Sequence, residues 1–243
     1  MFLTPRWLAS HVFVVALIAA FVAAGLWQLE RLDRRRAENE RIEARLDESV
    51  DLSGVDPATS ELEFVRVTME GSYDTDRARD ILVGNRVANG SPGFWIWSVF
   101  DLADGSEIMV NRGFANRAAV LQGGDRLDPP PGPTLVAGRL RRGIDSGSLS
   151  DDGFEITRPD AALIASDRSV DSRFDPSLYV EVISQEPDDV DAIEPVPAPE
   201  LGDGPHLSYA FQWFTFAILG TVGYGLVLRR ITRGDAARGD VPY

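Results

Sequence analysis

Two long apolar segments stand out in the pattern of hydrophobic and polar positions. Residues 7–29 and 209–228 contain no charged side chain, and a much more polar stretch separates them. An α-helix of about 20 apolar residues spans the hydrocarbon core of a bilayer. Trp7 and Trp27 lie at the two ends of the first segment, where indole rings favour the membrane interface. The pattern therefore predicts two transmembrane helices.

The first segment has a second interpretation. Residues 22–24 read Val-Ala-Ala and would serve as a cleavage site, so a secretory signal peptide is the alternative. The apolar stretch is longer than a typical signal core and ends in an interfacial Trp-Gln pair, which favours a retained anchor. Small residues at regular spacing in both segments predict close packing against another helix. They are Ala16, Ala20 and Ala24, Ala19 and Ala23, and Gly220, Gly223 and Gly225.

The chain between the two segments changes character after a charged stretch. That stretch lacks Gly and Pro and carries Arg31, Arg35 and Glu38 at helical spacing, which predicts a helical, solvated stalk. Alternating apolar and polar positions further on predict strands. The expected strands are 64–71, 80–86, 94–102, 107–112, 134–140 and 178–183, with a short helix at 159–165. Asp104-Gly105 predicts a hairpin turn, because glycine readily adopts positive φ.

These elements predict a membrane protein in which two transmembrane α-helices flank a small, mainly antiparallel β (α+β) extracytoplasmic domain, built as a sheet or barrel. The expected order begins with a cytoplasmic N-terminus (1–6), the first transmembrane helix (7–29) and the helical stalk (30–52). It continues with the β-rich domain (53–194), a stiff Pro-rich linker (195–205), the second transmembrane helix (206–228) and a cytoplasmic tail (229–243).

The arginines give two conflicting signals about orientation. Arg229, Arg230 and Arg233 directly follow the second apolar segment, and no basic residue lies shortly before it. The positive-inside rule therefore places the C-terminus in the cytoplasm and the domain outside. A group of arginines from Arg31 to Arg45 follows the first segment and favours the opposite orientation. The signal from the arginines after the second apolar segment is preferred, because basic residues lie on only one side of that segment.

Composition excludes several classes of function. The chain has 38 acidic and 24 basic residues, a net charge of −14, so nucleic acid is not an expected partner. The absence of cysteine excludes disulfides, thiolate metal sites and covalent haem attachment through cysteines. Phosphate-binding loops, nucleophile elbows and HExxH motifs are also absent, so the sequence does not indicate an enzyme.

The candidate chemistry rests on two histidines and one arginine. His11 lies in the first apolar segment and His206 just before the second, so a hairpin puts them at opposite membrane faces. With His206 helical, Tyr209 and Trp213 follow at i+3 and i+7, an arrangement that could hold a flat porphyrin. An ordinary interfacial histidine above an aromatic belt is the alternative, and spacing alone favours it. Arg112 is more consistent with a structural salt bridge than with a ligand contact.

The sequence also resembles a known family in several blocks. Gly25, Trp27, Gln28 and Arg31 match the G-x-W-Q-x-x-R signature that closes the first membrane helix of the surfeit locus protein 1 family. The further blocks resemble V-G-N-R with G-F at 83–86 and 93–94, D-G with V-N-R-G-W at 104–105 and 110–114, and H-L-x-Y-A-x-x-W-F at 206–214. Asn111, Arg112 and Gly113 lie in the third of these four blocks. All four come in the family's order and span nearly the whole chain.

The sequence departs from the family pattern at a few positions. Phe114 stands where a tryptophan is usual after the Arg-Gly pair. A proline often found after the Gly-aromatic block is missing. The acidic tract at 186–194 looks like an insertion. These departures affect the details expected of the sheet and leave the two-helix plan unchanged.

The resemblance implies an assembly factor for haem–copper cytochrome c oxidase, a non-enzymatic chaperone that binds haem a and helps to place it in the catalytic subunit. It implies His206 as the axial ligand of the haem iron, with Tyr209 and Trp213 as pocket walls. The implied partners are the oxidase catalytic subunit, the lipid bilayer and, as a further candidate, a haem a synthase. The implied location is the cell or inner membrane, with both termini cytoplasmic. The alternatives are a scaffold that binds no haem and a membrane-anchored extracytoplasmic enzyme.

Overall fold

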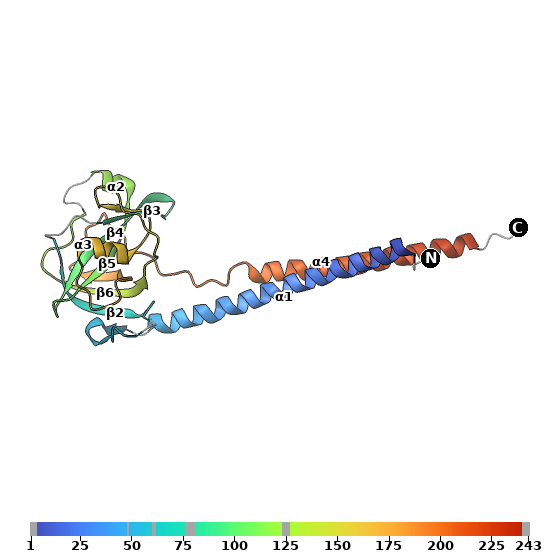
Figure 1. Ribbon diagram of the computed structural model, residues 1–243, viewed down its shortest axis with the longest axis horizontal. Coiled ribbons are helices and arrows are strands. Elements are labelled where there is room, and N and C mark those ends of the chain that lie inside the picture. The colour runs from blue at the N-terminus through green and yellow to red at the C-terminus, as the bar shows by residue number, and fades with distance from the viewer. Residues whose placement is uncertain (1–3, 48, 60–61, 76–80, 123–126, 240–243) are drawn as a thin grey trace. The chain divides into compact units, whose positions relative to one another are not determined.

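The computed structural model describes residues 4–47, 49–59, 62–75, 81–122 and 127–239. The chain divides into two compact units. One contains the first 41 residues together with residues 200–243, and the other contains residues 42–199. Figure 1 traces the chain through both in colour from the N-terminus to the C-terminus.

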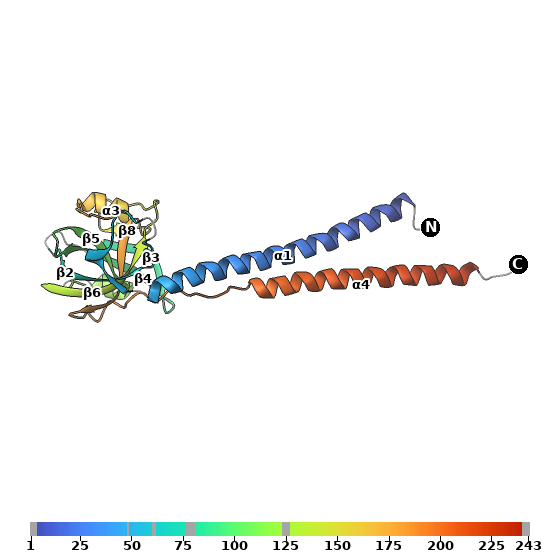
Figure 2. The same cartoon turned by 90° about the horizontal axis from the view of Figure 1, so that it is seen from below.

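The first unit is a pair of long helices, α1 (Pro5–Asp47) and α4 (His206–Gly239). Both are long and apolar enough to cross a membrane, by length and composition. Contacts of Gln28 with His206 and of His11 with Tyr224 show that the two helices run antiparallel. Figures 1 and 2 show α1 and α4 as neighbours from two directions. The two predicted apolar helices are therefore confirmed as helices.

The two helices meet along a narrow seam of partly or fully buried positions. The steps between these positions are three and four residues, the spacing with which helices pack at a small crossing angle. On α1 the seam comprises His11, Val14, Ile18, Phe21, Gly25, Gln28 and Leu32, and on α4 it comprises His206, Ala210, Trp213, Ala217, Gly220 and Tyr224. Most other large apolar side chains of both apolar segments are exposed, as expected of helices that face lipid.

The expected small-residue contacts are only partly present. Ala16, Ala19, Ala20 and Ala23 are exposed and lie off the seam. The close approach occurs instead at Gly25, where an added Cβ would lie 2.6 Å from the ring of Phe214 on α4. Gly223 and Gly225 have no neighbouring atom within 4 Å of such a Cβ among the described residues. The surface of α4 at these two glycines is therefore accessible to another helix.

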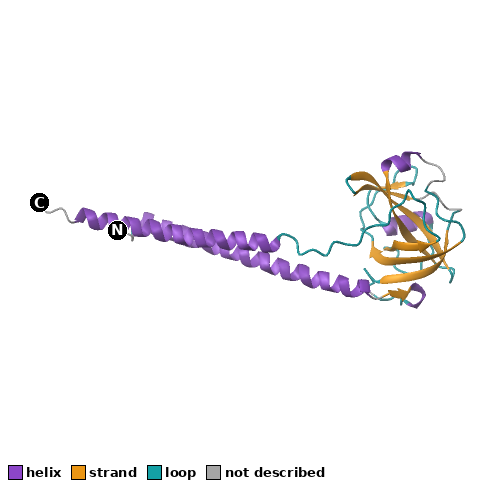
Figure 3. Cartoon of the chain, turned by 180° about the vertical axis from the view of Figure 1, so that it is seen from behind, coloured by secondary structure: helices purple, strands orange, loops and turns teal. Residues whose placement is uncertain are grey.

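The second unit is a domain built on an eight-stranded sheet. Its strands are β1 (Ser49–Asp51), β2 (Arg66–Tyr73), β3 (Ile81–Ala88), β4 (Ser91–Leu102), β5 (Glu107–Asn116), β6 (Pro133–Arg142), β7 (Glu155–Ile156) and β8 (Leu178–Glu186). Its helical elements are the 3₁₀ turn η1 (Leu52–Gly54), α2 (Arg117–Gln122) and α3 (Ala161–Arg168). Figure 3 shows the strands as a strongly curved sheet.

The strand order closes part of the sheet into a barrel. The neighbours run β2, β6, β8, β5, β4, and the end of β4 then pairs with β2 through Tyr73 and Phe100. Most of these pairs are antiparallel, but β5 and β8 are parallel. Five strands in a closed ring cannot alternate in direction throughout, so one neighbouring pair must be parallel. The domain is therefore a mixed sheet in which antiparallel pairs predominate, as expected, and β1–β2 and β3–β7 add parallel pairs outside the ring.

The barrel interior is filled by alternate side chains of its strands. The largest cluster of buried apolar residues contains Val67, Met69, Tyr73, Phe100, Ile108, Val110, Val136, Leu140, Leu178, Val180 and Val182. A second cluster lies on the other face of β4, β5 and β8, where Trp97, Met109 and Tyr179 are covered by Ile164 of α3. Each fully buried large side chain contributes about 1.5–3 kcal/mol. These two clusters of buried side chains stabilise the domain.

The six predicted strands are all present, most with longer bounds than expected, and residue 80 of the second lies outside the described residues. The predicted turn is also confirmed, because Gly105 has φ +83° and its N–H donates to the carbonyl of Leu102 at 2.9 Å. The stalk prediction was too long. Helix α1 ends at Asp47, and residues 49–54 form β1 and η1.

The Pro-rich linker is partly fixed to the domain. Buried Arg139 pairs with buried Glu181, and its Nη2 also donates to the carbonyl of Pro197 at 2.8 Å and to that of Val196 at 3.3 Å. An arginine paired in this way has its charge and its donors satisfied inside the protein. The first half of the linker is thus part of the domain.

Candidate functional site

The candidate site begins at His206, the first residue of α4. Its ring is half-buried, and its Nδ1 lies 3.0 Å from Oε1 of Gln28 on α1. An amide oxygen can only accept a hydrogen bond, so Nδ1 carries the proton and donates. In the neutral imidazole the other nitrogen, Nε2, then presents a lone pair. Gln28 thus fixes both the orientation of the ring and the nitrogen that is available to a ligand.

Glycine at position 204 keeps the other edge of this ring accessible. Gly204 has φ +68°, and a Cβ added there would lie 3.5 Å from both Nε2 and Cδ2 of His206. A larger side chain would therefore lie directly against the ligand-binding edge. Glycine meets both demands of this position, since it tolerates positive φ and leaves the edge of the ring clear.

A pocket of about 220 Å³ adjoins His206. It is lined by His206 together with Arg31, Arg34, Arg35 and Glu38 of α1. Three guanidinium groups and one carboxylate make this a positively charged site in a chain whose net charge is −14. Two exposed ion pairs hold the arginines loosely, Arg34 with Glu30 at 3.3 Å and Arg35 with Glu38 at 3.7 Å. Exposed pairs of this kind contribute little, so they yield readily to a stronger anion.

The segment before His206 is tied to the same side of α1. Arg36 donates to Oδ2 of Asp203 from Nε at 3.0 Å and from Nη2 at 2.7 Å. Asn39 donates to the carbonyl of Gly202 at 3.3 Å. The hydrogen bond and the charge of Arg36 hold the pKa of Asp203 below its usual value. These contacts fix the position at which α4 begins, and with it the position of His206.

The aromatic residues after His206 divide into two roles. Trp213 is part of the helix seam and stacks on Phe21 of α1, with ring centroids 5.8 Å apart. Tyr209 is 47% exposed, and its ring takes part in no aromatic contact with α1 among the residues that the structure describes. The structure therefore places Tyr209 on the open surface one turn from His206, and Trp213 between the helices. The assignment of both as pocket walls stays a prediction.

The G-x-W-Q-x-x-R signature has a physical basis in this helix pair. Gly25 admits the ring of Phe214, Gln28 holds His206, and Arg31 lines the pocket. Trp27 points outward and is 51% exposed, with the guanidinium of Arg31 over its ring at 5.9 Å. Three of the four signature residues thus serve the contact between α1 and α4 or the pocket beside it.

Several site residues were missed by sequence reasoning. They are Arg34, Glu38, Asn39 and Asp203, together with Arg35, whose spacing had been interpreted as a solvated stalk. The spacing of some of these residues along the helix could have indicated that they belong to the site. Arg31, Arg35 and Glu38 follow Gln28 at three, seven and ten residues, which continues the face that carries Gln28.

The two histidines have separate partners, as the hairpin predicted. His11 Nδ1 is hydrogen-bonded to the hydroxyl of Tyr224, near the other end of the helix pair. Gln28 follows His11 by 17 positions in the helix, which corresponds to about 25 Å along its axis. Within the described residues no group of three or more His, Asp or Glu side chains is arranged to hold a bare metal ion. A metal at His206 would therefore bring most of its own ligands.

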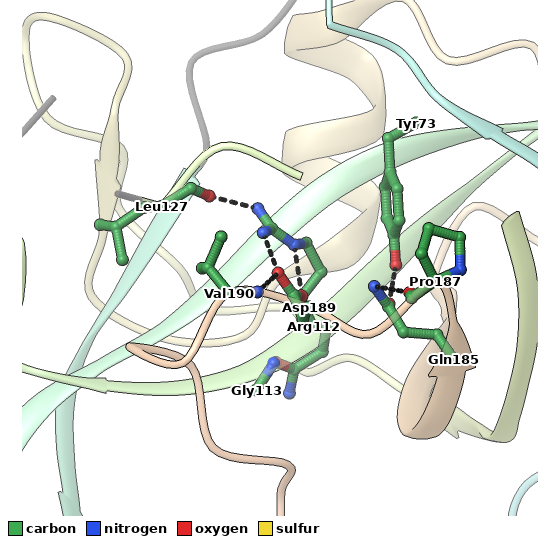
Figure 4. A network of polar contacts seen from close by, with 9 residues as sticks. Tyr73, Arg112, Gly113, Leu127, Gln185, Pro187, Asp189 and Val190 are labelled. Atoms are coloured by element: carbon green, nitrogen blue, oxygen red, sulfur yellow. Dashed lines mark hydrogen bonds and ion pairs between the residues drawn. The ribbon is translucent and has the colours of Figure 1, made fainter. Parts of the chain in front are cut away.

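Arg112 forms the structural salt bridge that the sequence favoured. Its side chain is fully buried, and it donates from Nε to Asp189 at 2.9 Å, from Nη2 to the other oxygen of Asp189, and from Nη1 to the carbonyl of Leu127 at 2.6 Å (Figure 4). Burial of an arginine requires such complete pairing. The partner comes from the acidic tract 186–194, which therefore completes the domain core.

The residues beside Arg112 fit the tract closely. Buried Asn111 accepts a hydrogen bond from the backbone N–H of Gly113 at 3.2 Å. Gly113 has φ +148°, and an added Cβ would lie 2.3 Å from the carbonyl oxygen of Glu194. Phe114 and Glu194 exchange backbone hydrogen bonds of 2.7 and 2.8 Å. The acidic tract thus packs against the N-R-G block and is hydrogen-bonded beside it.

The fold and the site together define a class of protein: a small mixed β-barrel domain with two candidate membrane helices that present a hydrogen-bonded histidine beside an arginine-lined pocket. The SURF1 family profile matches residues 15–218, so the chain belongs to the SURF1 family. The chain is 28% identical over 241 residues to SURF1-like proteins of Mycobacterium bovis and of two Mycobacterium tuberculosis strains, which covers 92% of this chain and 83% of each relative. The family resemblance predicted from the four sequence blocks is confirmed.

Proposed function

We propose that this protein is an assembly factor that carries haem a to cytochrome c oxidase. The SURF1 family is known generally as a family of oxidase assembly factors and not of enzymes. The observation that carries the proposal for this chain is the state of His206. Oε1 of Gln28 accepts a hydrogen bond from the Nδ1–H group, and Nε2 is left with a lone pair beside an open pocket.

The residues present fit haem as a cargo. A neutral imidazole nitrogen is an ordinary axial ligand of haem iron. A hydrogen bond on the opposite ring nitrogen raises the basicity of such a ligand and fixes its direction. His206 supplies one protein ligand, and His11 is engaged with Tyr224 far along the helix pair. A single protein ligand suits a carrier, because the cargo must leave for another protein.

The helix pair supplies the apolar part of such a site. Leu207, Tyr209 and Phe211 are exposed within the first two turns of α4. In the proposed orientation both termini are cytoplasmic and these turns lie at the outer face of the cell membrane. The proposed partners are the catalytic subunit of the oxidase, which receives haem a, and a haem a synthase, which would provide it.

The proposal is tested on the full chain purified in detergent from a host that makes haem a. The wild-type protein is expected to show a haem a absorption spectrum, and His206→Ala is expected to lose it. His11→Ala is the matched control, since it removes the other histidine and should keep the spectrum. Retention of the same bound haem a by His206→Ala would overturn the ligand assignment. A wild-type protein without haem a from such a host would overturn the carrier function.

A scaffold that contacts the oxidase without binding haem is the second candidate. It is favoured by the open glycine face at Gly223 and Gly225 and by the exposed alanines of α1, which allow close approach of another membrane helix. Copurification of oxidase subunits with the haem-free protein from a haem-replete host would support it. Loss of that copurification in His206→Ala would speak against it.

A further inference from the structure

The arginines beside His206 are more than a histidine ligand requires. Axial ligation needs one imidazole and its hydrogen-bond partner, yet three guanidinium groups line the same pocket. Arg31 makes no ion pair with any residue that the structure describes, and its guanidinium rests over the ring of Trp27. Its five N–H donors are therefore available to a ligand. A cationic pocket that adjoins a metal-binding nitrogen indicates a ligand that carries both a metal and an anion.

We propose that Arg31, Arg34 and Arg35 bind the propionate carboxylates of the haem whose iron binds His206. This inference rests on the proposed function and specifies how the site recognises its ligand. The planar guanidinium fork matches a carboxylate with two parallel hydrogen bonds. The pocket of about 220 Å³ has room for carboxylate groups at the edge of a porphyrin, and the rest of the ring lies outside it.

The charges of the pocket match this ligand. The residues that line the pocket, three arginines and Glu38, carry a charge of +2, and Glu30, which pairs with Arg34, lies outside this lining. Two propionates carry a charge of −2, so the occupied pocket is neutral. The weak pairs of Arg34 with Glu30 and of Arg35 with Glu38 keep the arginines near the pocket without blocking it, because both pairs are exposed and longer than 3 Å.

The position of the arginines also sets the direction of the ligand. They follow Gln28 along α1, on the side of His206 that lies away from the apolar segment 7–29. The carboxylate edge is therefore held away from the bilayer, and the opposite, apolar edge is turned toward it. Tyr209 lies one turn from His206 in that second direction, and its exposed ring is in place to contact the macrocycle.

The test compares two probes on the full-length protein in nonionic detergent without added lipid. The probes are iron protoporphyrin IX and its dimethyl ester, in which the propionates are masked, and the change in the Soret band gives the dissociation constant. Arg31→Gln is expected to weaken binding of the free acid about tenfold, the loss of one charge-assisted contact. It should leave binding of the ester unchanged. Arg41→Gln is the matched control, because Arg41 is exposed on the same helix and does not line the pocket.

The outcomes separate this inference from the function on which it rests. If the wild type binds the free acid through His206 but Arg31→Gln, Arg34→Gln and Arg35→Gln all bind it equally well, the carboxylate contact is wrong and the carrier function stands. That result would also be expected if the arginines served lipid phosphates instead. Equal weakening of acid and ester would show general damage to the site and would equally overturn the contact. No binding of either probe by the wild type would overturn both proposals.

Discussion

Replacement of Gly113 by alanine is the sharpest test of how the acidic tract joins the domain. At φ +148° the backbone lies in a region that glycine alone adopts without strain, and the strain for alanine is about 2 kcal/mol. The added Cβ would also lie 2.3 Å from the backbone oxygen of Glu194. Since this neighbour is backbone, the tract must move, and the two hydrogen bonds between Phe114 and Glu194 are lost, at about 1 kcal/mol each.

Gly113→Ala is therefore expected to destabilise the domain by about 4 kcal/mol, which lowers its Tm by about 10 °C. The measurement is thermal unfolding of the detergent-solubilised chain, followed by near-ultraviolet circular dichroism of the fully buried Trp97. Gly132→Ala is the matched control. Gly132 has φ +86°, but a Cβ there would meet nothing within 4 Å, so it reports strain alone.

The difference between the two variants isolates the contact with the tract. If Gly113→Ala lowers the Tm no more than Gly132→Ala does, the tract moves aside at no cost. In that case the acidic tract would be an insertion that adds nothing to the stability of the domain. A clearly larger drop for Gly113→Ala supports the tract as part of the domain core.

Three further predictions concern polar contacts. Gln28→Leu removes the acceptor of the Nδ1 proton of the site histidine and should weaken haem binding at least tenfold in a Soret titration, while an unchanged affinity would refute the role of Gln28. Arg112→Gln leaves partly buried Asp189 without its cation and should destabilise the domain by about 3 kcal/mol in thermal unfolding, whereas a loss below about 1 kcal/mol would contradict it. The depressed pKa of Asp203 means that its contact with Arg36 contributes at neutral pH and is lost as the pH falls through that lowered pKa. Carbon-13 NMR of the Asp203 carboxyl should give a midpoint below the ordinary 3.8 in the wild type and near it in Arg36→Gln, and equal midpoints would contradict the contact.

Local patterns predicted most of the elements of the fold. The strand at 94–102 and the turn at Gly105 were found from alternation and from the φ preference of glycine, which are properties of neighbouring residues. The two-residue strand β7 could not be found in this way, because it is too short to show any period. The parallel pairing of β5 and β8 was also invisible, since it follows from the number of strands in the closed ring and not from any one of them.

The sequence identified His206, the central residue of the site, but not the contacts that hold it. His206 was identified by its position before an apolar helix, but its partner Gln28 lies 178 residues away in the chain. Asp189 lies 77 residues from Arg112. Contacts at such separations depend on how helices and strands come together, which hydrophobic periodicity does not encode. Only the family resemblance joined the segments that contain Gln28 and His206 before the structure placed them in contact.

The arginines after the first apolar segment now have a role that explains the conflict over orientation. The antiparallel contacts of His206 with Gln28 and of His11 with Tyr224 mean that, if both helices span a membrane, the two chain termini lie on the same side of it, so one charge signal must be overruled. In the proposed orientation Arg31 to Arg36 lie outside, against the usual bias. In the proposed site their charge serves a ligand in the pocket beside His206, and Arg36 pairs with Asp203. Arg229, Arg230 and Arg233, in the C-terminal part of α4, form no ion pair among the described residues, and they are the ones that agree with the bias.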